Sequence, residues 1–122
     1  MYTENIREIE TLITHYFEGI FYGDVAKLRN CFHDDITIYG DINGNAYLKN
    51  VEDYIESVQN RKSPDDLNEV LKMDIIGIDN IGNIAMAKLR VPMLGYTYYD
   101  YLSLYKFNNN WKIVNKIFTH KA

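Results

Sequence analysis

Two titratable side chains stand where proton transfer is chemically plausible. Asp100 lies in an alternating apolar and polar segment, Tyr96 to Phe107. On an apolar face a carboxylate loses hydration and becomes a stronger proton acceptor, which makes Asp100 a candidate general base. His33 follows a short helical pattern and precedes two aspartates, so its imidazole is a candidate proton carrier. Asp100 and His33 are therefore the two candidates for acid–base catalysis.

Each candidate also has a purely structural interpretation. Asp100 at a hydrated strand end would bond only a tyrosine or a backbone N–H, and His33 at a helix C-terminus would cap carbonyls. His33, Asp34 and Asp35 are adjacent. Adjacent residues rarely converge on one metal ion, and no second histidine has ligand spacing. We therefore expect no metal and no cofactor.

A hairpin near the C-terminus assigns the residues around Asp100 to faces of a sheet. Three consecutive asparagines, 108–110, predict a tight turn because asparagine tolerates positive φ. A two-residue turn at either position within them puts Asp100 on the same face as a set of mostly apolar residues, which we assign to the concave side. We expect a ligand pocket on this side, lined by Tyr16, Tyr39, Tyr54, Leu102, Trp111 and Asn115.

The opposite face of the same hairpin mixes aromatic and polar side chains. Tyr101, Ser103, Tyr105 and Phe118 fall on it, together with Lys112 and Lys116. Such a face is too aromatic for solvent and too polar for a core, and it is typical of subunit interfaces. The pattern predicts a homodimer formed through the convex face.

The remaining elements follow from periodicity. Apolar residues at three- and four-residue steps predict a helix from Thr3 to Gly23, a short one after Asp24 and a third after Asn50. Residues 35–39, 70–78, 84–91, 96–107 and 111–120 alternate as strands, and 40–45 has turn composition. The expected fold is α+β: a cone-shaped, curved antiparallel sheet with three helices from the N-terminal half on its concave face.

Composition narrows the function classes. The chain has 122 residues, 47% of them hydrophobic, and a net charge of −4, which predicts one domain over residues 1–122. Lysines and arginines are scattered, so we expect no nucleic-acid binding. No apolar run reaches the roughly 20 residues that span a bilayer. The lone Cys31 and the absence of a leader pattern favour a cytoplasmic protein without membrane partners.

Several segments resemble a known superfamily. Residues 16–20, Gly23-Asp24 and 28–35 are similar to the opening of nuclear transport factor 2-like proteins, and 78–88, 100–104 and 111–118 continue the likeness. The closer resemblance is to the bacterial lumazine-binding-like, polyketide-cyclase-like branch. The resemblance implies a cone-shaped α+β domain that is commonly dimeric. Members include ketosteroid isomerase, scytalone dehydratase, polyketide cyclases and non-catalytic binding proteins.

Three functions are compatible with this resemblance, because pocket side chains rather than the fold set the activity. The favoured hypothesis is a domain that binds a flat or partly apolar small molecule in the cone. The second is a cofactor-free isomerase, dehydratase or cyclase. The third is a protein-interaction or dimerisation domain.

Overall fold

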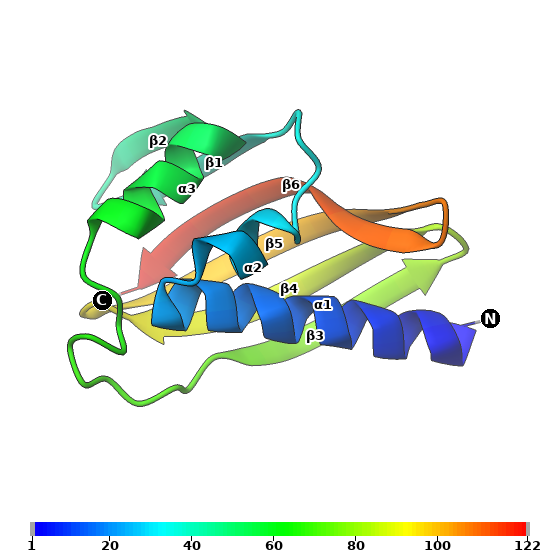
Figure 1. Cartoon of the computed structure of the whole chain (residues 1–122), viewed down its shortest axis with the longest axis horizontal. Coiled ribbons are helices and arrows are strands. Elements are labelled where there is room, and N and C mark those ends of the chain that lie inside the picture. The colour runs from blue at the N-terminus through cyan, green and yellow to red at the C-terminus, as the bar shows by residue number, and fades with distance from the viewer. Residues whose placement is uncertain (1, 122) are drawn as a thin grey trace.

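Residues 2–121 of the computed structural model form three helices and one curved, six-stranded sheet (Figure 1). The helices are α1 (Tyr2–Tyr22), α2 (Val25–Arg29) and α3 (Val51–Asn60). The strands are β1 (Thr37–Ile42), β2 (Asn45–Asn50), β3 (Asp74–Ile81), β4 (Ile84–Met93), β5 (Tyr96–Phe107) and β6 (Asn110–Lys121). The sheet order is β2-β1-β6-β5-β4-β3. The predicted α+β fold is confirmed.

Local sequence explains where the helices begin and end. Gly23 adopts a φ of 68° after α1, a conformation that glycine reaches without steric cost. The side chain of Asp24 accepts a hydrogen bond from Lys27 N and caps α2, and Asn50 caps α3 in the same way through Asp53 N. None of the helices described between residues 2 and 121 combines the length and apolar character needed to cross a membrane.

Three details of the sheet differ from the sequence expectations. Residues 40–45 are not one long turn: only Asn43 and Gly44 turn, and the flanking residues pair as the β1–β2 hairpin. Strand β3 begins at Asp74 rather than at Val70. Strand β1 pairs with β6 in parallel, so the sheet is not wholly antiparallel. This pairing joins two segments that are distant in sequence, and local periodicity cannot predict such a pairing.

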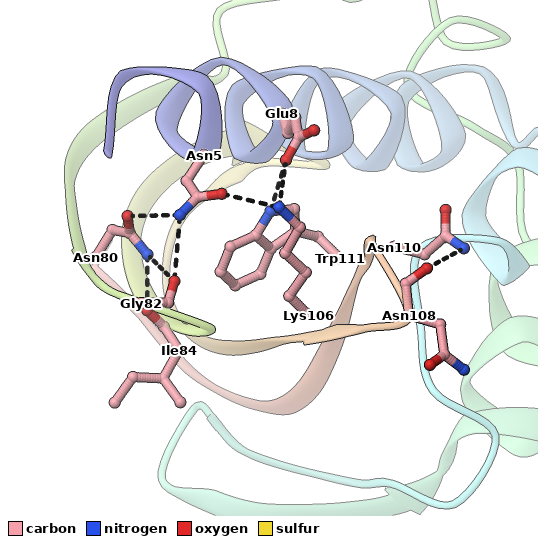
Figure 2. A network of polar contacts seen from close by, with 9 residues as sticks. All are labelled: Asn5, Glu8, Asn80, Gly82, Ile84, Lys106, Asn108, Asn110 and Trp111. Atoms are coloured by element: carbon pink, nitrogen blue, oxygen red, sulfur yellow. Dashed lines mark hydrogen bonds and ion pairs between the residues drawn. The ribbon is translucent and has the colours of Figure 1, made fainter. Parts of the chain in front are cut away.

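A polar network fastens the N-terminal turns of α1 to the sheet (Figure 2). Buried Asn5 donates to Asn80 Oδ1 and to Gly82 O and accepts from Lys106 Nζ at 3.1 Å. Glu8 accepts from Trp111 Nε1 at 3.1 Å and pairs with Lys106. Lys106, the β5 partner of Trp111, lies six positions along the strand from Asp100. At the usual rise per residue this network lies about 20 Å along the sheet from Asp100.

A β-bulge in β6 decides which side chains enter the cone. Leu104 pairs with Ile113, but Ser103 pairs with Asn115, so Val114 is an extra, unpaired residue. Side-chain parity reverses there. Beyond the bulge, Lys116 and Phe118 point inward while Asn115 and Ile117 point outward.

Gly40 makes room for the inward ring of Phe118, its partner in β6. A Cβ at Gly40 would collide with three atoms of that ring. We expect Gly40→Ala to lower the free energy of unfolding by about 1–3 kcal/mol, the usual cost of overpacking. Gly77→Ala is the control, because a Cβ at Gly77 meets nothing within 4 Å. Urea denaturation followed by circular dichroism measures both, and equal stabilities of the two variants would contradict this account of Gly40.

Candidate functional site

A small cavity of about 50 Å³ lies inside the cone, between the helices and the concave face of the sheet. At roughly 10–15 Å³ per water position, it has room for about four waters, and it is smaller than the roughly 150 Å³ of a cavity that binds benzene. Most of its wall is apolar or aromatic: Ile20, Ile42, Tyr47, Tyr54, Val91, Met93, Tyr98 and Phe118. Its charged lining residues are Asp100, Lys116 and Arg61. An apolar cavity with a few converging polar groups is the common form of a small-molecule site.

Asp100 reaches the cavity from β5 and is met by a tyrosine from α1. The Tyr16 hydroxyl donates to Asp100 Oδ2 at 2.5 Å, and Asp100 is only 3% exposed. A distance of this length is typical of a hydroxyl donating to a carboxylate. The sequence offered two interpretations of Asp100, a pocket carboxylate or a structural partner of tyrosine, and the geometry combines both.

Lys116 enters the same region from β6 and is met by a tyrosine from α3. Its Nζ donates to the Tyr54 hydroxyl at 2.8 Å, and the residue is 4% exposed. The ammonium also lies over the rings of Tyr54, Tyr16 and Phe118 at 4.3, 5.1 and 5.4 Å from their centroids. Aromatic faces attract a cation, so this surrounding replaces part of the lost hydration.

Burial and charge together set the protonation of this group. Burial raises the pKa of Tyr16 well above its ordinary value of 10.0, and the neighbouring Asp100 carboxylate raises it further. For Lys116, burial by itself lowers the pKa, but attraction to Tyr54 and Asp100 outweighs it, and the pKa ends above 10.5. Tyr16 is therefore a neutral donor and Lys116 a cation at neutral pH.

The other residues predicted to line the pocket lie elsewhere. Tyr39 is 50% exposed and pairs with outward-facing Ile117, because Ile38 takes the inward position in β1. Asn115 faces outward because of the bulge, which the hairpin parity did not include. Leu102 is fully buried core rather than cavity wall, and Trp111 belongs to the polar network about 20 Å away.

His33 lies apart from the cavity-lining residues. Its ring stacks on Phe107 with centroids 5.0 Å apart, and its Nδ1 accepts from Asp35 N. Phe107 ends β5 at the turn, seven positions along the strand from Asp100. Cys31 packs in the core, where burial raises its pKa to about 12 despite nearby Lys112 and Lys27. A thiol with that pKa is not a nucleophile at neutral pH.

Sequence reasoning missed two charged residues of the cavity. Lys116 was expected on the convex face, and Phe118 with it, because an uninterrupted strand would place them there. The sequence does carry a trace of the bulge, since apolar residues stand adjacent at 113–114 and again at 117–118. Arg61 follows α3 in a segment that we expected to be a loop, and no local pattern indicates that its side chain turns inward.

A larger hollow of about 650 Å³ opens on the surface between α1, α2 and the β5–β6 turn. Glu8, Thr11, His15, Asp24 and Lys27 are among its lining residues. These are mostly exposed side chains, whereas Asp100 and Lys116 are buried and converge on one space. We therefore place the candidate site at the smaller cavity.

The architecture defines the class of protein. A solved protein of unknown function from Silicibacter pomeroyi, described as NTF-2 like, superposes with a TM-score of 0.91 at 20% identity over 99% of both chains. An NTF2-like protein of unknown function from Shewanella baltica superposes at 0.86 with 22% identity over 100% of this chain and 98% of that one. The protein thus has the nuclear transport factor 2-like fold.

The sequence places the chain within that class more narrowly. Residues 4–119 match the family described as "Putative lumazine-binding", and the chain belongs to that family. Among curated proteins, it is 26% identical over 106 residues to Aldolase FrzH from Cladobotryum sp, covering 84% of this chain and 81% of that protein.

The raised pKa of Tyr16 gives a pH-dependent test. We expect Tyr16→Phe to lower the free energy of unfolding at pH 7 by about 1–3 kcal/mol, because Asp100 loses its buried donor. The unfolded chain releases the tyrosine proton near pH 10.0, whereas the folded chain retains it. The contribution of Tyr16 is therefore complete below pH 10.0 and declines as pH rises beyond it.

Urea denaturation at pH 7, 9, 10 and 11 measures the stability gap between wild type and Tyr16→Phe, and the gap is expected to narrow above pH 10.0. Tyr22→Phe is the matched control, since Tyr22 lies on the same helix and is exposed. A gap that stays constant to pH 11 would contradict the raised pKa.

Proposed function

We propose that this domain binds a compact, partly apolar small molecule in the cone cavity. The observation that carries the proposal is the convergence of buried Asp100 and Lys116, with their tyrosine partners, on an otherwise apolar cavity. Polar groups held by partners from two different helices are pre-organised to orient a ligand. The membership in a family described as lumazine-binding supports small-molecule binding as well.

The dimensions of the cavity bear on the kind of ligand. A volume of about 50 Å³ is below the roughly 150 Å³ of a cavity that binds benzene, so even a one-ring ligand requires rim side chains such as Met93 to move aside. The ring of Phe118 and the rings of Tyr47 and Tyr98 line the space, and flat faces favour a flat ligand.

Acid–base catalysis is a second candidate, and the relative named an aldolase favours it. In this hypothesis Asp100 accepts a proton from the carbon beside a carbonyl, and protonated Lys116 stabilises the resulting oxyanion. Because the pKa of Lys116 is raised, the amine is a cation and would act as a donor rather than as a nucleophile. Binding ranks first because it requires no step beyond the observed contacts.

We further propose that the convex face pairs with a second copy of the chain. Exposed apolar side chains cover neighbouring strands on this face, among them Ile81, Ile84, Met86, Tyr101 and Tyr105. Several of them line a groove of about 390 Å³ with Ser103 and Val114. Contiguous apolar surface of this kind marks an interaction site.

Blocking the cavity tests the binding function. Met93 lines the cavity at its partly exposed rim, so Met93→Trp is expected to fill the space without displacing core residues. Benzyl alcohol, a neutral one-ring probe, should shift backbone amide NMR signals around the cavity in wild type and not in Met93→Trp.

Met86→Trp is the control, because Met86 lies on the same strand and is exposed on the outer face. It should retain the response to benzyl alcohol. Equal responses of the two variants, or signal changes centred on the hollow around His15, would overturn the cavity as the binding site.

The convex-face dimer is tested by analytical ultracentrifugation at micromolar concentration. Wild type should sediment as a dimer. A standard stable interface buries about 1,600 Å² in total. Tyr101→Glu should shift it toward monomer, because a charge would be buried in the apolar contact. Tyr22→Glu, at an exposed position on α1 and away from the convex face, should not. A monomeric wild type refutes this proposal.

A further inference from the structure

The cavity contains one charged group whose hydrogen bonds are incomplete. Arg61 follows the last residue of α3, and its extended backbone, with φ −93° and ψ 160°, ends the helix there. Its side chain lines the cavity with Asp100 and Lys116. Within residues 2–121, its buried Nε and Nη2 atoms find no hydrogen-bond partner.

These two atoms form one edge of the guanidinium group, and that edge has a specific complement. On Arg90 of the same chain, Nε and Nη2 contact the two carboxylate oxygens of Asp74 at 3.2 and 3.1 Å. The two parallel N–H bonds match the spacing of carboxylate oxygens. Arg61 lines the cavity, and within residues 2–121 no protein carboxylate occupies this edge.

Leaving the edge of Arg61 empty is costly. A guanidinium does not release its proton, so Arg61 cannot become neutral as a buried lysine can. Unmade bonds to a charged donor cost more than those to a neutral one. An anionic group of a ligand would satisfy both atoms at once.

The charges of the cavity set the charge of that ligand. Lys116 and Asp100 carry opposite charges, and their attraction raises the pKa of Lys116. These two charges offset each other. The positive charge of Arg61 is left over, which favours a single negative charge. The remaining wall is apolar, including Ile20, Ile42 and Val91.

We propose that Arg61 holds the carboxylate of a small monocarboxylic acid in this cavity, through paired hydrogen bonds from Nε and Nη2. This inference deepens the proposed binding function and rests on it. It specifies a ligand with a planar monoanion at one end and a compact apolar body, no larger than one ring, which enters when rim side chains move aside.

Three one-ring probes separate the possible outcomes: benzoate, neutral benzyl alcohol and dianionic phenyl phosphate. Isothermal titration calorimetry, with amide NMR shifts to locate the site, should show that benzoate binds wild type at least about 10-fold more tightly than either other probe. Arg61→Gln should weaken benzoate about 10- to 100-fold, the range for lost bonds to a charged group, and leave benzyl alcohol unchanged. Arg61→Lys, which keeps the charge but loses the two-atom edge, should restore only part of the benzoate affinity.

Arg90→Gln is the matched control, since Arg90 already uses the same edge on an exposed carboxylate. It should leave all three affinities unchanged. Equal affinities for benzoate and benzyl alcohol in wild type, or an equal loss of both in Arg61→Gln, would overturn the carboxylate assignment while binding itself stands. A preference for phenyl phosphate would also overturn it, in favour of a phosphate anion. If no probe moves the amides of the cavity, the proposed binding function fails together with this inference.

Discussion

The burial of a lysine ammonium is the constraint on which the arrangement of this domain depends. An isolated charge is expensive to remove from water, so Lys116 needs an opposite charge, a hydrogen-bond acceptor and polarisable neighbours. Asp100, the Tyr54 hydroxyl and three aromatic rings supply them. Asp100 lies on β5, Tyr54 on α3, Tyr16 on α1 and Phe118 on β6, so the charged group couples α1 and α3 to the two central strands.

This coupling explains why the cavity lies where it does. Tyr16 on α1 bonds Asp100, and Tyr54 on α3 bonds Lys116. Each of these two helices is therefore separated from the sheet by the length of a tyrosine side chain. At the other end of α1, Asn5 and Glu8 fasten the helix to the β3–β4 turn and to Trp111 (Figure 2). The helix is therefore held at two points along its length.

Much of the fold was predictable because its signals are local. Helix periodicity, the capping residues Asp24 and Asn50, and the asparagine turn each act within a few residues. The inward position of Asp100 followed from the hairpin, because the extra residue lies in β6 and the alternation along β5 is unbroken. Strand β2 was missed because its residues alternate weakly and it pairs only with β1 at the sheet edge.

The sequence by itself determined the fold class, the order of helices and most strands, and an inward carboxylate on β5. Only the tertiary structure decided which side chains accompany that carboxylate. One extra residue at Val114 exchanged Asn115 for Lys116 and brought Phe118 inside. The chain path after α3 turned Arg61 toward them. A bulge and a loop path are settled by pairing and packing between distant segments, so the free energies that select them are absent from any local pattern.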